Sequence, residues 1–237
     1  MPRICVYTAI MGDYDELKPV VRQSVACDWI CFADRPGPEK PAGWTVIETD
    51  PPQVHPRMRA KFFKLLSHEV FPCGRVSDTY GKGPLAGRFY DYLVWIDGSI
   101  RVKSPTFVEE LVGAIGRYDW AMFKHPDRDC VYDEVVASRH MAKYANQPLE
   151  RQVAEYRSDG FPAKAGLMAC GVIARRTRSP TLAWIGELWW RENVIWSYQD
   201  QLSLPYVLWK TGYGYDRIDI NLWKNDWFNC IPHKSTR

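Results

Sequence analysis

The chain lacks a long hydrophobic run. No stretch of 18 apolar residues occurs in its 237 residues, and no apolar segment of signal-peptide length follows the one arginine near its start. A transmembrane helix needs about 20 apolar residues, so we expect neither a membrane span nor a membrane partner. Internal repeats and low-complexity segments are also missing. The length and a hydrophobic content of 46% favour a single globular domain over residues 1–237.

Paired cysteine spacing and strong charge are missing too. The cysteines form no Cys-x-x-Cys pair; they number seven and lie at positions 5, 27, 31, 73, 130, 170 and 230. An odd count without zinc spacing indicates reduced thiols and therefore a cytoplasmic location. The net charge is only +3. This value argues against a dedicated DNA-binding protein and mildly favours anionic partners such as nucleotide sugars.

The most informative segment present is YLVWIDGSIRV, at positions 92–102. Its first five residues have strand composition, so Asp97 falls at the carboxyl end of a predicted buried strand. Ligands bind at that end in open α/β sheets. The Asp97 carboxylate and the Ser99 hydroxyl, with a glycine between them, suit a divalent ion held against phosphate oxygens. A strand that ends in Asp-Gly is also an ordinary turn, and the segment alone does not separate the two interpretations.

Hydrophobic periodicity predicts the secondary structure. Strands alternate with helices in the first half, which is typical of an α/β fold with a mostly parallel central sheet flanked by helices. Strands are predicted at 3–9, 28–34, 44–47, 92–96, 120–123, 167–174 and 217–220, and helices at 57–70, 106–115, 133–144, 148–156, 181–192 and 201–210. We expect a surface turn at 37–43, a mobile loop at 77–87 and a short basic tail at 228–237.

A basic stripe follows the predicted helix 57–70. Arg57, Lys61, Lys64 and His68 fall within about 60° of arc at about 100° per residue. No acidic residue lies within the stripe to neutralise it. The stripe therefore predicts a phosphate-binding cleft, and the alternative is a solvated helix face.

The first strand and its loop are predicted to end at the same sheet edge. Backbone groups of Thr8 and Ala9 are candidates to contact a nucleobase or ribose. The side chains of Asp13 and Tyr14 are candidates to hold it by hydrogen bonding or stacking. An ordinary strand-to-loop turn is the alternative.

Two further groups are candidates to act on a sugar. His125 and Asp129 belong to a cluster of ionisable residues that follows a strand, although such clusters are often solvated loops. Asp200 begins a predicted helix, whose dipole keeps a carboxylate ionised, so it is either a catalytic carboxylate or a helix cap. Asp129 is the next catalytic candidate. Tyr198 and the pair Trp189–Trp190 are candidates for an apolar wall against a sugar face.

Several sequence blocks together resemble a known family. The blocks are YTAIMGDY (7–14), RMRAK (57–61), WIDGS (95–99), HPDRDCVYDE (125–134) and QDQLS (199–203). Their order over about residues 3 to 210 resembles a glycosyltransferase-like family formerly described as a domain of unknown function. Plant members of that family include a mucilage-related hexosyltransferase.

The resemblance implies a GT-A fold, a nucleotide-sugar donor (usually a UDP-sugar) and Mn²⁺ or Mg²⁺. Asp97 and Ser99 occupy the positions of the Asp-x-Asp motif, with Ser99 replacing the second carboxylate. A histidine near the carboxyl end often completes the metal shell in this fold, which makes His233 the candidate ligand, with His125 as the alternative.

The implied reaction moves a hexose or pentose to an acceptor hydroxyl on a glycan, a small molecule or a modified DNA base. A module that binds nucleotide sugars or carbohydrates without turnover is the alternative. The sequence leaves open the sugar, the acceptor, the stereochemistry and the oligomeric state.

Overall fold

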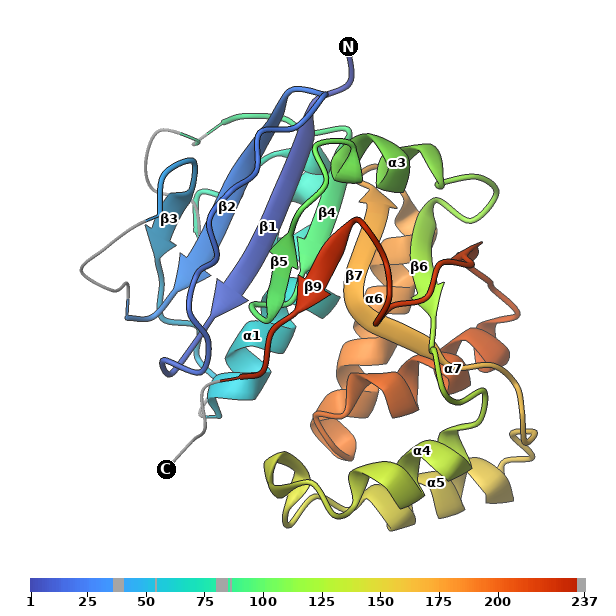
Figure 1. Ribbon diagram of the computed structural model, residues 1–237. Helices are drawn as coiled ribbons and strands as arrows, with labels where there is room; N and C mark the ends of the chain where they lie inside the picture. Colours follow the sequence, from blue (N-terminus) through green and yellow to red (C-terminus); the bar gives the residue numbers. More distant parts are fainter. Residues whose placement is uncertain (36–40, 54, 80–84, 86, 234–237) are drawn as a thin grey trace.

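The computed structural model describes residues 1–35, 41–53, 55–79, 85 and 87–233. The predicted turn 37–43, the predicted loop 77–87 and the end of the predicted tail therefore lie partly outside the described residues. The described part of the chain forms a central sheet with helices packed against it (Figure 1).

The central sheet has seven strands in the order β3-β2-β1-β4-β7-β6-β8. The strands are β1 (Ile4–Ile10), β2 (Cys27–Ala33), β3 (Thr45–Glu48), β4 (Tyr92–Ile96), β6 (Trp120–Lys124), β7 (Met168–Arg176) and β8 (Asp216–Ile218). Only β7 runs antiparallel to its neighbours, β4 and β6. The prediction of a mostly parallel α/β sheet is confirmed, and every predicted strand is present.

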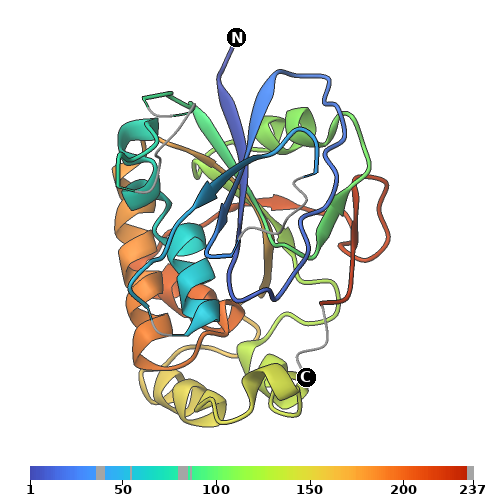
Figure 2. The same cartoon turned by 90° about the vertical axis from the view of Figure 1, so that its left-hand side faces the viewer.

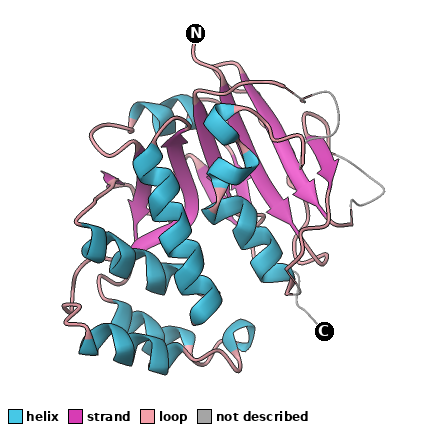
Figure 3. Ribbon diagram, turned by 180° about the vertical axis from the view of Figure 1, so that it is seen from behind, coloured by secondary structure: helices cyan, strands magenta, loops and turns pink. Residues whose placement is uncertain are grey.

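Both faces of the sheet are buried, which explains the continuous apolar runs in its strands. Along β1, Cys5 and Tyr7 point into one core, and Ile4 and Val6 point into the other. The helices α1 (Pro56–Leu65), α2 (Ser67–Val70), α6 (Pro180–Ile195) and α7 (Asp200–Thr211) cover the first face (Figure 3). The second face is covered by α3 (Phe107–Gly113) and by a small sheet of β5 (Ile100–Val102) and β9 (Phe228–Cys230). Figure 2 shows the two layers on opposite sides of the sheet.

A third core belongs to a helical lobe between β6 and β7. The lobe contains α4 (Val131–Ser138), a short 3₁₀ helix η2 (Ala142–Tyr144) and α5 (Leu149–Ser158). Its apolar side chains pack with Leu202 and Tyr206 of α7. The remaining 3₁₀ helix, η1 (Pro72–Gly74), follows α2. The lobe lies below the carboxyl end of β6, at the bottom of Figure 1.

The structure corrects two of the predicted helices. The predicted helix 57–70 breaks at Leu66, whose φ and ψ are −97° and 47°, so it becomes α1 and α2. The predicted helix 133–144 starts at Val131, ends at Ser138 and is followed by η2. Periodicity does not report such breaks, because the apolar spacing continues across them.

The structure also corrects the predicted tail. Phe228–Cys230 form β9 and pair antiparallel with β5. Phe228 is 1% exposed and packs edge-on against Phe107 and Phe123. The start of the predicted tail is therefore part of the core of the molecule.

Two absences concern the described residues. No helix among them combines the length and apolar character that a membrane crossing needs. All seven cysteines are free thiols, as predicted from their spacing.

Candidate functional site

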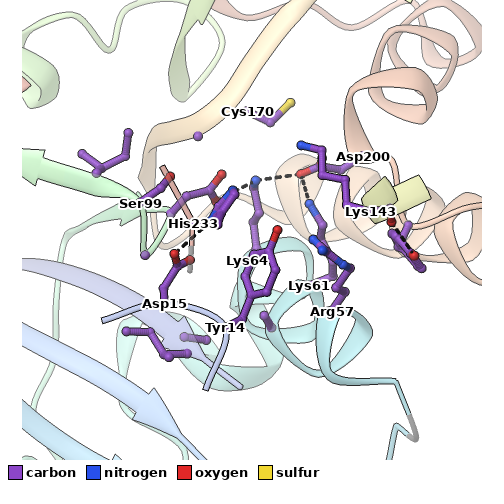
Figure 4. A pocket seen from close by; sticks show the side chains of 18 of the residues that line it. Tyr14, Asp15, Arg57, Lys61, Lys64, Ser99, Lys143, Cys170, Asp200 and His233 are labelled. Atoms are coloured by element: carbon purple, nitrogen blue, oxygen red, sulfur yellow. Dashed lines mark hydrogen bonds and ion pairs between the residues drawn. The ribbon is translucent and has the colours of Figure 1, made fainter. Parts of the chain in front are cut away.

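A cavity of about 680 Å³ opens where β1 and β4 end and β7 begins. The elements around it are α1, η2, the start of α7 and the segment after β9 (Figure 4). Most of the predicted site residues line it, namely Ala9, Tyr14, Arg57, Lys61, Lys64, Asp97, Ser99, Tyr198, Asp200 and His233. Segments that are far apart in the sequence therefore meet in one cavity.

Four charged side chains form an ion-pair cluster in this cavity, which we call the Lys–Asp cluster (Lys61, Lys64, Asp97 and Asp200). The Nζ atoms of Lys61 and Lys64 lie 2.6 and 2.7 Å from Oδ2 of Asp200. Lys64 Nζ also lies 3.0 Å from Oδ1 of Asp97, so it bridges the two carboxylates. The side chain of Lys64 is 2% exposed and that of Asp97 is 36% exposed. Asp97 thus faces the open part of the cavity, whereas Lys64 lies beneath it.

Burial and charge act in opposite directions on the titration of this cluster. Burial alone would raise the pKa of Asp200, but Lys61 and Lys64 outweigh it and hold that pKa well below its ordinary value. Burial would lower the pKa of Lys64, but Asp200 and Asp97 together raise it. Burial prevails at Lys61, whose pKa is lowered despite the nearby Asp200. Asp200 is therefore an ionised carboxylate at neutral pH.

Local sequence explains how these side chains reach the cavity. Pro56 occupies the first turn of α1, and the His55 side chain accepts a hydrogen bond from the Arg57 amide, so the helix starts just before the basic stripe. The helical spacing then brings Lys61 and Lys64 to the same side as Arg57. Asp200 is the first residue of α7, where the helix dipole favours a carboxylate.

The Asp97 carboxylate is oriented by Trp95, a residue of the preceding strand β4. The Trp95 indole donates to Oδ1 of Asp97 at 2.7 Å. A Cβ on Gly171 would lie 3.4 Å from Oδ2 of Asp97, and one on Gly98 would lie 2.8 Å from Oδ2 of Asp15. The first distance is an ordinary contact, whereas the second is too short for a side chain, so the close approach of Asp15 requires glycine at position 98.

The segment after β9 closes one side of the cavity. His233 Nδ1 lies 2.9 Å from Oδ1 of Asp15, and its ring lies 4.5 Å from that of Tyr14. The Arg57 guanidinium lies 4.1 Å from the centre of the Tyr14 ring. The carboxyl-terminal segment, the loop after β1 and the start of α1 thus form one continuous rim.

An aromatic and basic wall continues from this rim, because the Arg57 guanidinium also lies 5.6 Å from the centre of the Tyr198 ring. The Tyr198 ring stacks on His55 at 4.8 Å, and its hydroxyl donates to the Lys143 carbonyl. The Tyr144 hydroxyl donates to the Gln199 side chain. Lys143 lines the cavity, and burial together with the charge of Arg57 lowers the pKa of its ammonium. Flat rings beside basic groups are common in sites that bind sugars and nucleotides.

Many residues of the cavity were not predicted from the sequence, and three of them, Asp15, Lys143 and Tyr144, make the contacts described above. Asp15 follows a predicted block by one residue, so its proximity was the only available signal. Lys143 and Tyr144 lie on a predicted helix of the lobe, with nothing in their spacing to indicate that the lobe folds over the sheet edge.

Two candidates on the first strand and its loop do not line the cavity. Thr8, whose backbone was predicted to contact the nucleoside, is only 1% exposed and does not line the cavity. Asp13 adopts a left-handed conformation with a φ of 55°, and the cavity is lined by Gly12, Tyr14 and Asp15 around it. The prediction for the nucleoside contact therefore reduces to Ala9 and Tyr14.

Three more candidates also lie outside the cavity. The His125 ring, 5% exposed, accepts hydrogen bonds from the amides of Asp127 and Arg128 and so stabilises a turn. Asp129 is exposed, and its backbone carbonyl accepts from the amide of Gly166. Trp190 packs edge-on against Phe62 of α1 at 6.0 Å. Their positions after a strand or near Asp200 were misleading, because neither property fixes where a side chain points.

His68 separates from the basic stripe at the helix break. It forms an ion pair with Glu187 of α6 at 2.9 Å and does not line the cavity. With Glu69, these residues form the one place in the described chain where three His, Cys, Asp or Glu ligand atoms lie within 4.8 Å of one another. Asp97 and His233 share the cavity but do not form such a preassembled set.

Comparison with known proteins agrees with the geometry. A family model described as "TOD1/MUCI70, glycosyltransferase-like domain" matches residues 40–235. The match omits the block at 7–14 and reaches past His233, whereas the sequence blocks cover about residues 3 to 210. A search of curated proteins finds no significant match. The resemblance seen in the sequence blocks is confirmed, and the chain belongs to the TOD1/MUCI70 glycosyltransferase-like family.

Proposed function

We propose that this protein is a glycosyltransferase that moves a sugar from a nucleotide-sugar donor, a UDP-sugar, to an acceptor hydroxyl. The observation that carries the proposal is the Lys–Asp cluster, which lies in a large cavity at the ligand-binding edge of a glycosyltransferase-like domain. Ionised groups held this rigidly suit a reaction in which charge separates between a sugar and a leaving diphosphate.

The cavity offers separate surfaces to the parts of the donor. Ala9 and Tyr14 lie at the end of β1, where they suit the nucleoside. The diphosphate belongs between Asp97 and the basic residues Arg57 and Lys61. Asp200 and Tyr198 then border the sugar. The proposed acceptor enters from the lobe that carries Lys143.

Charge balance favours a divalent ion. The two lysines and two aspartates of the Lys–Asp cluster cancel in formal charge, so they add no net positive charge for a diphosphate. Arg57 and Lys143 supply part of the compensation. Asp97 and Ser99 are hard oxygen donors of the kind that Mn²⁺ or Mg²⁺ prefers, and the Asp97 side chain is 36% exposed toward the cavity.

In this proposal Asp97 and Ser99 would hold the metal, and His233, which contacts Asp15 in this structure, would be the third ligand. The bound ion would supply positive charge that stabilises the leaving diphosphate. The chain contributes the orientation of Asp97 through Trp95 and Lys64. The basic residues Arg57 and Lys61 stabilise the remaining phosphate charge.

Asp200 is proposed to stabilise the sugar in the transition state. Two lysines lower its pKa, which makes the carboxylate a weak base. A persistent negative charge is well suited to a sugar carbon that becomes positive. We therefore favour electrostatic stabilisation over proton abstraction as the role of Asp200.

The test is calorimetry with UDP, with and without Mn²⁺, followed by a donor hydrolysis assay. We expect UDP to bind more tightly with Mn²⁺, and Asp97→Ala to abolish the metal-dependent part. Asp78→Ala is the matched control, because Asp78 is exposed, pairs with Arg75 and lies outside the cavity lining. Unchanged metal dependence in Asp97→Ala would exclude the metal role.

The alternative is a binding module without activity. The same assays distinguish it, because such a module would bind UDP-sugars and never release free sugar or transfer it. Mass spectrometry of the products, over a panel of donors with glycan, small-molecule and modified-DNA acceptors, would then identify the reaction.

A further inference from the structure

A buried arginine lies on the sheet beneath the Lys–Asp cluster. Arg175 of β7 is 5% exposed and is in register with Leu93 of β4 and Trp120 of β6. Side chains alternate along a strand, so Arg175 shares the face of Ile173, whose side chain belongs to the core under α1 and α6. No ion pair joins Arg175 to a carboxylate in the described part of the chain, and burial lowers the pKa of its guanidinium despite the nearby Tyr7 and Cys170.

The two hydrogen bonds of the Arg175 side chain are both made at the junction of α1 and α2. Its Nη1 donates to the Lys64 carbonyl at 3.0 Å and to the Ser67 hydroxyl at 2.8 Å. Its Nε and Nη2 have no hydrogen-bond partner among the described residues. A buried charge with unsatisfied donors destabilises a fold, and an apolar side chain of similar volume would fill the same space. Packing of the core therefore does not explain this residue.

The two bonds lie where α1 stops. The helix ends at Leu65, so Lys64 lies in its last turn, where backbone carbonyls lack the donor that the next turn would provide. Helix ends also fray. The Arg175 guanidinium supplies a donor to the carbonyl of Lys64 itself, and it fixes Ser67 at the start of α2 by the same atom.

We infer that Arg175 is a positioning residue for Lys64. It does not line the cavity, and it acts through the backbone at the end of α1. By holding that turn, it keeps the Lys64 ammonium between Asp97 and Asp200, at 3.0 and 2.7 Å. A residue of strand β7 thereby fixes the position of the Lys64 ammonium, which belongs to the last turn of α1.

The first test observes the Lys64 ammonium directly. Buried, ion-paired ammonium groups exchange slowly with water and give ¹H–¹⁵N signals, and the Lys64 signal is identified by its loss in Lys64→Met. We expect Arg175→Met to shift that signal or broaden it beyond detection. Arg176→Met is the matched control, because Arg176 is the next residue but lies on the exposed side, bonded to Tyr92 and Asp119. The control should leave the signal in place.

An unchanged Lys64 signal in folded Arg175→Met would overturn the inference. If Arg175→Met does not fold, Arg175→Lys decides the question, because the shorter lysine keeps the charge but does not place a donor at the position of Nη1, which bonds the Lys64 carbonyl and the Ser67 hydroxyl. A displaced Lys64 signal in Arg175→Lys supports the inference, and an unchanged one contradicts it.

A second measurement rests on the proposed function. Arg175→Met should lower kcat for donor hydrolysis by about 10-fold to 100-fold with little change in KM, because a misplaced group costs rate more than binding. Arg175→Lys should recover part of that loss, and Arg176→Met should lose nothing. Equal kcat in Arg175→Met and the wild type would contradict the inference. A wild-type protein without turnover would refute the proposed function alone, since the ammonium signal does not depend on activity.

Discussion

At the scale of single residues, the Asp200 carboxylate forms ion pairs with Lys61 and Lys64 and lines the cavity. We expect Asp200→Asn to keep donor binding and to lose at least about 100-fold in turnover, because the shape is retained and the negative charge is not. Donor calorimetry and hydrolysis rates on the folded variant measure the two effects. Near-normal turnover would contradict a catalytic role for Asp200 and leave it a role in stability alone.

The same substitution has a predicted pH signature. The folded pKa of Asp200 lies below its unfolded value of about 3.9, so its contribution to stability is complete above that pH and is lost as the pH falls through the folded pKa. Removing one member of a buried ion pair costs about 3 to 5 kcal/mol. The difference in free energy of unfolding between wild type and Asp200→Asn should therefore be constant from pH 5 to 7 and shrink below about pH 4. Urea unfolding across this range checks it, and a gap that widens on acidification would contradict the assignment.

Lys61 offers a sharper test of donor binding than Lys64, because it is nearer to the open cavity. Its side chain is 17% exposed, against 2% for Lys64. Lys61→Ala should weaken donor binding by about 1.5 to 3 kcal/mol, the scale of a charged hydrogen bond. Arg59→Ala is the control on the same helix, since Arg59 pairs with Asp34 and Asp50. Calorimetry should show a loss in the first variant that the second does not share.

At the scale of elements, the end of the chain combines a core strand with a rim contact. Phe228→Ala should cost about 3 to 5 kcal/mol, because its ring is buried between two other phenylalanines. His233→Ala should cost less than about 1 kcal/mol, because its contact with Asp15 is partly exposed. Urea unfolding compares them. Equal destabilisation by His233→Ala and Phe228→Ala would contradict the small contribution expected of the contact between His233 and Asp15.

The elements also show what sequence reasoning can and cannot reach. The strand of Tyr92–Ile96 was predicted with its correct ends, because an apolar run bounded by Asp-Gly leaves little freedom. The break at Leu66 was not predicted, because the donor that replaces the helix bond is Arg175, more than a hundred residues away. The strand Phe228–Cys230 was missed for a related reason. A segment of three residues is too short to show a hydrophobic period, and this strand forms by pairing with β5.

At the scale of the whole molecule, ligand binding should be visible as stability. At a ligand concentration of about 100 times Kd, binding adds about 2.7 kcal/mol to the free energy of unfolding. For a chain of this size that corresponds to a Tm increase of roughly 5 to 11 °C. We expect UDP with Mn²⁺ to produce it, and UDP alone to produce less. Thermal-shift measurements on wild type and Asp97→Ala check this expectation, and equal shifts with and without Mn²⁺ would contradict the metal proposal.

The sequence predicts the site residues that lie at strand ends and on α1, but not those that the lobe contributes. Asp97 and the stripe of Arg57, Lys61 and Lys64 were found because strand ends and helical spacing are readable from sequence. Lys143 was not, because its position depends on how the lobe folds over the edge. His125 was assigned to the site on its place after a strand, and its hydrogen bonds show that it stabilises a turn instead.

The reversed direction of β7 has a consequence for how such a protein diversifies. The chain leaves the sheet after Lys124 and returns at Met168, and these two residues are paired neighbours. The chain joins everything between them, including Lys143, to the sheet at two adjacent points, and the core of this insertion packs on Leu202 and Tyr206 of α7. Segments joined in this way are exchanged or lengthened in evolution with little disturbance to their host, as in natural domain insertions. The proposed acceptor side is thus an insertion into the sheet, whereas Asp97 directly follows strand β4 and α1 packs on the sheet face. A chimera that exchanges residues 125–167 with those of a relative should therefore inherit a new acceptor and keep its donor.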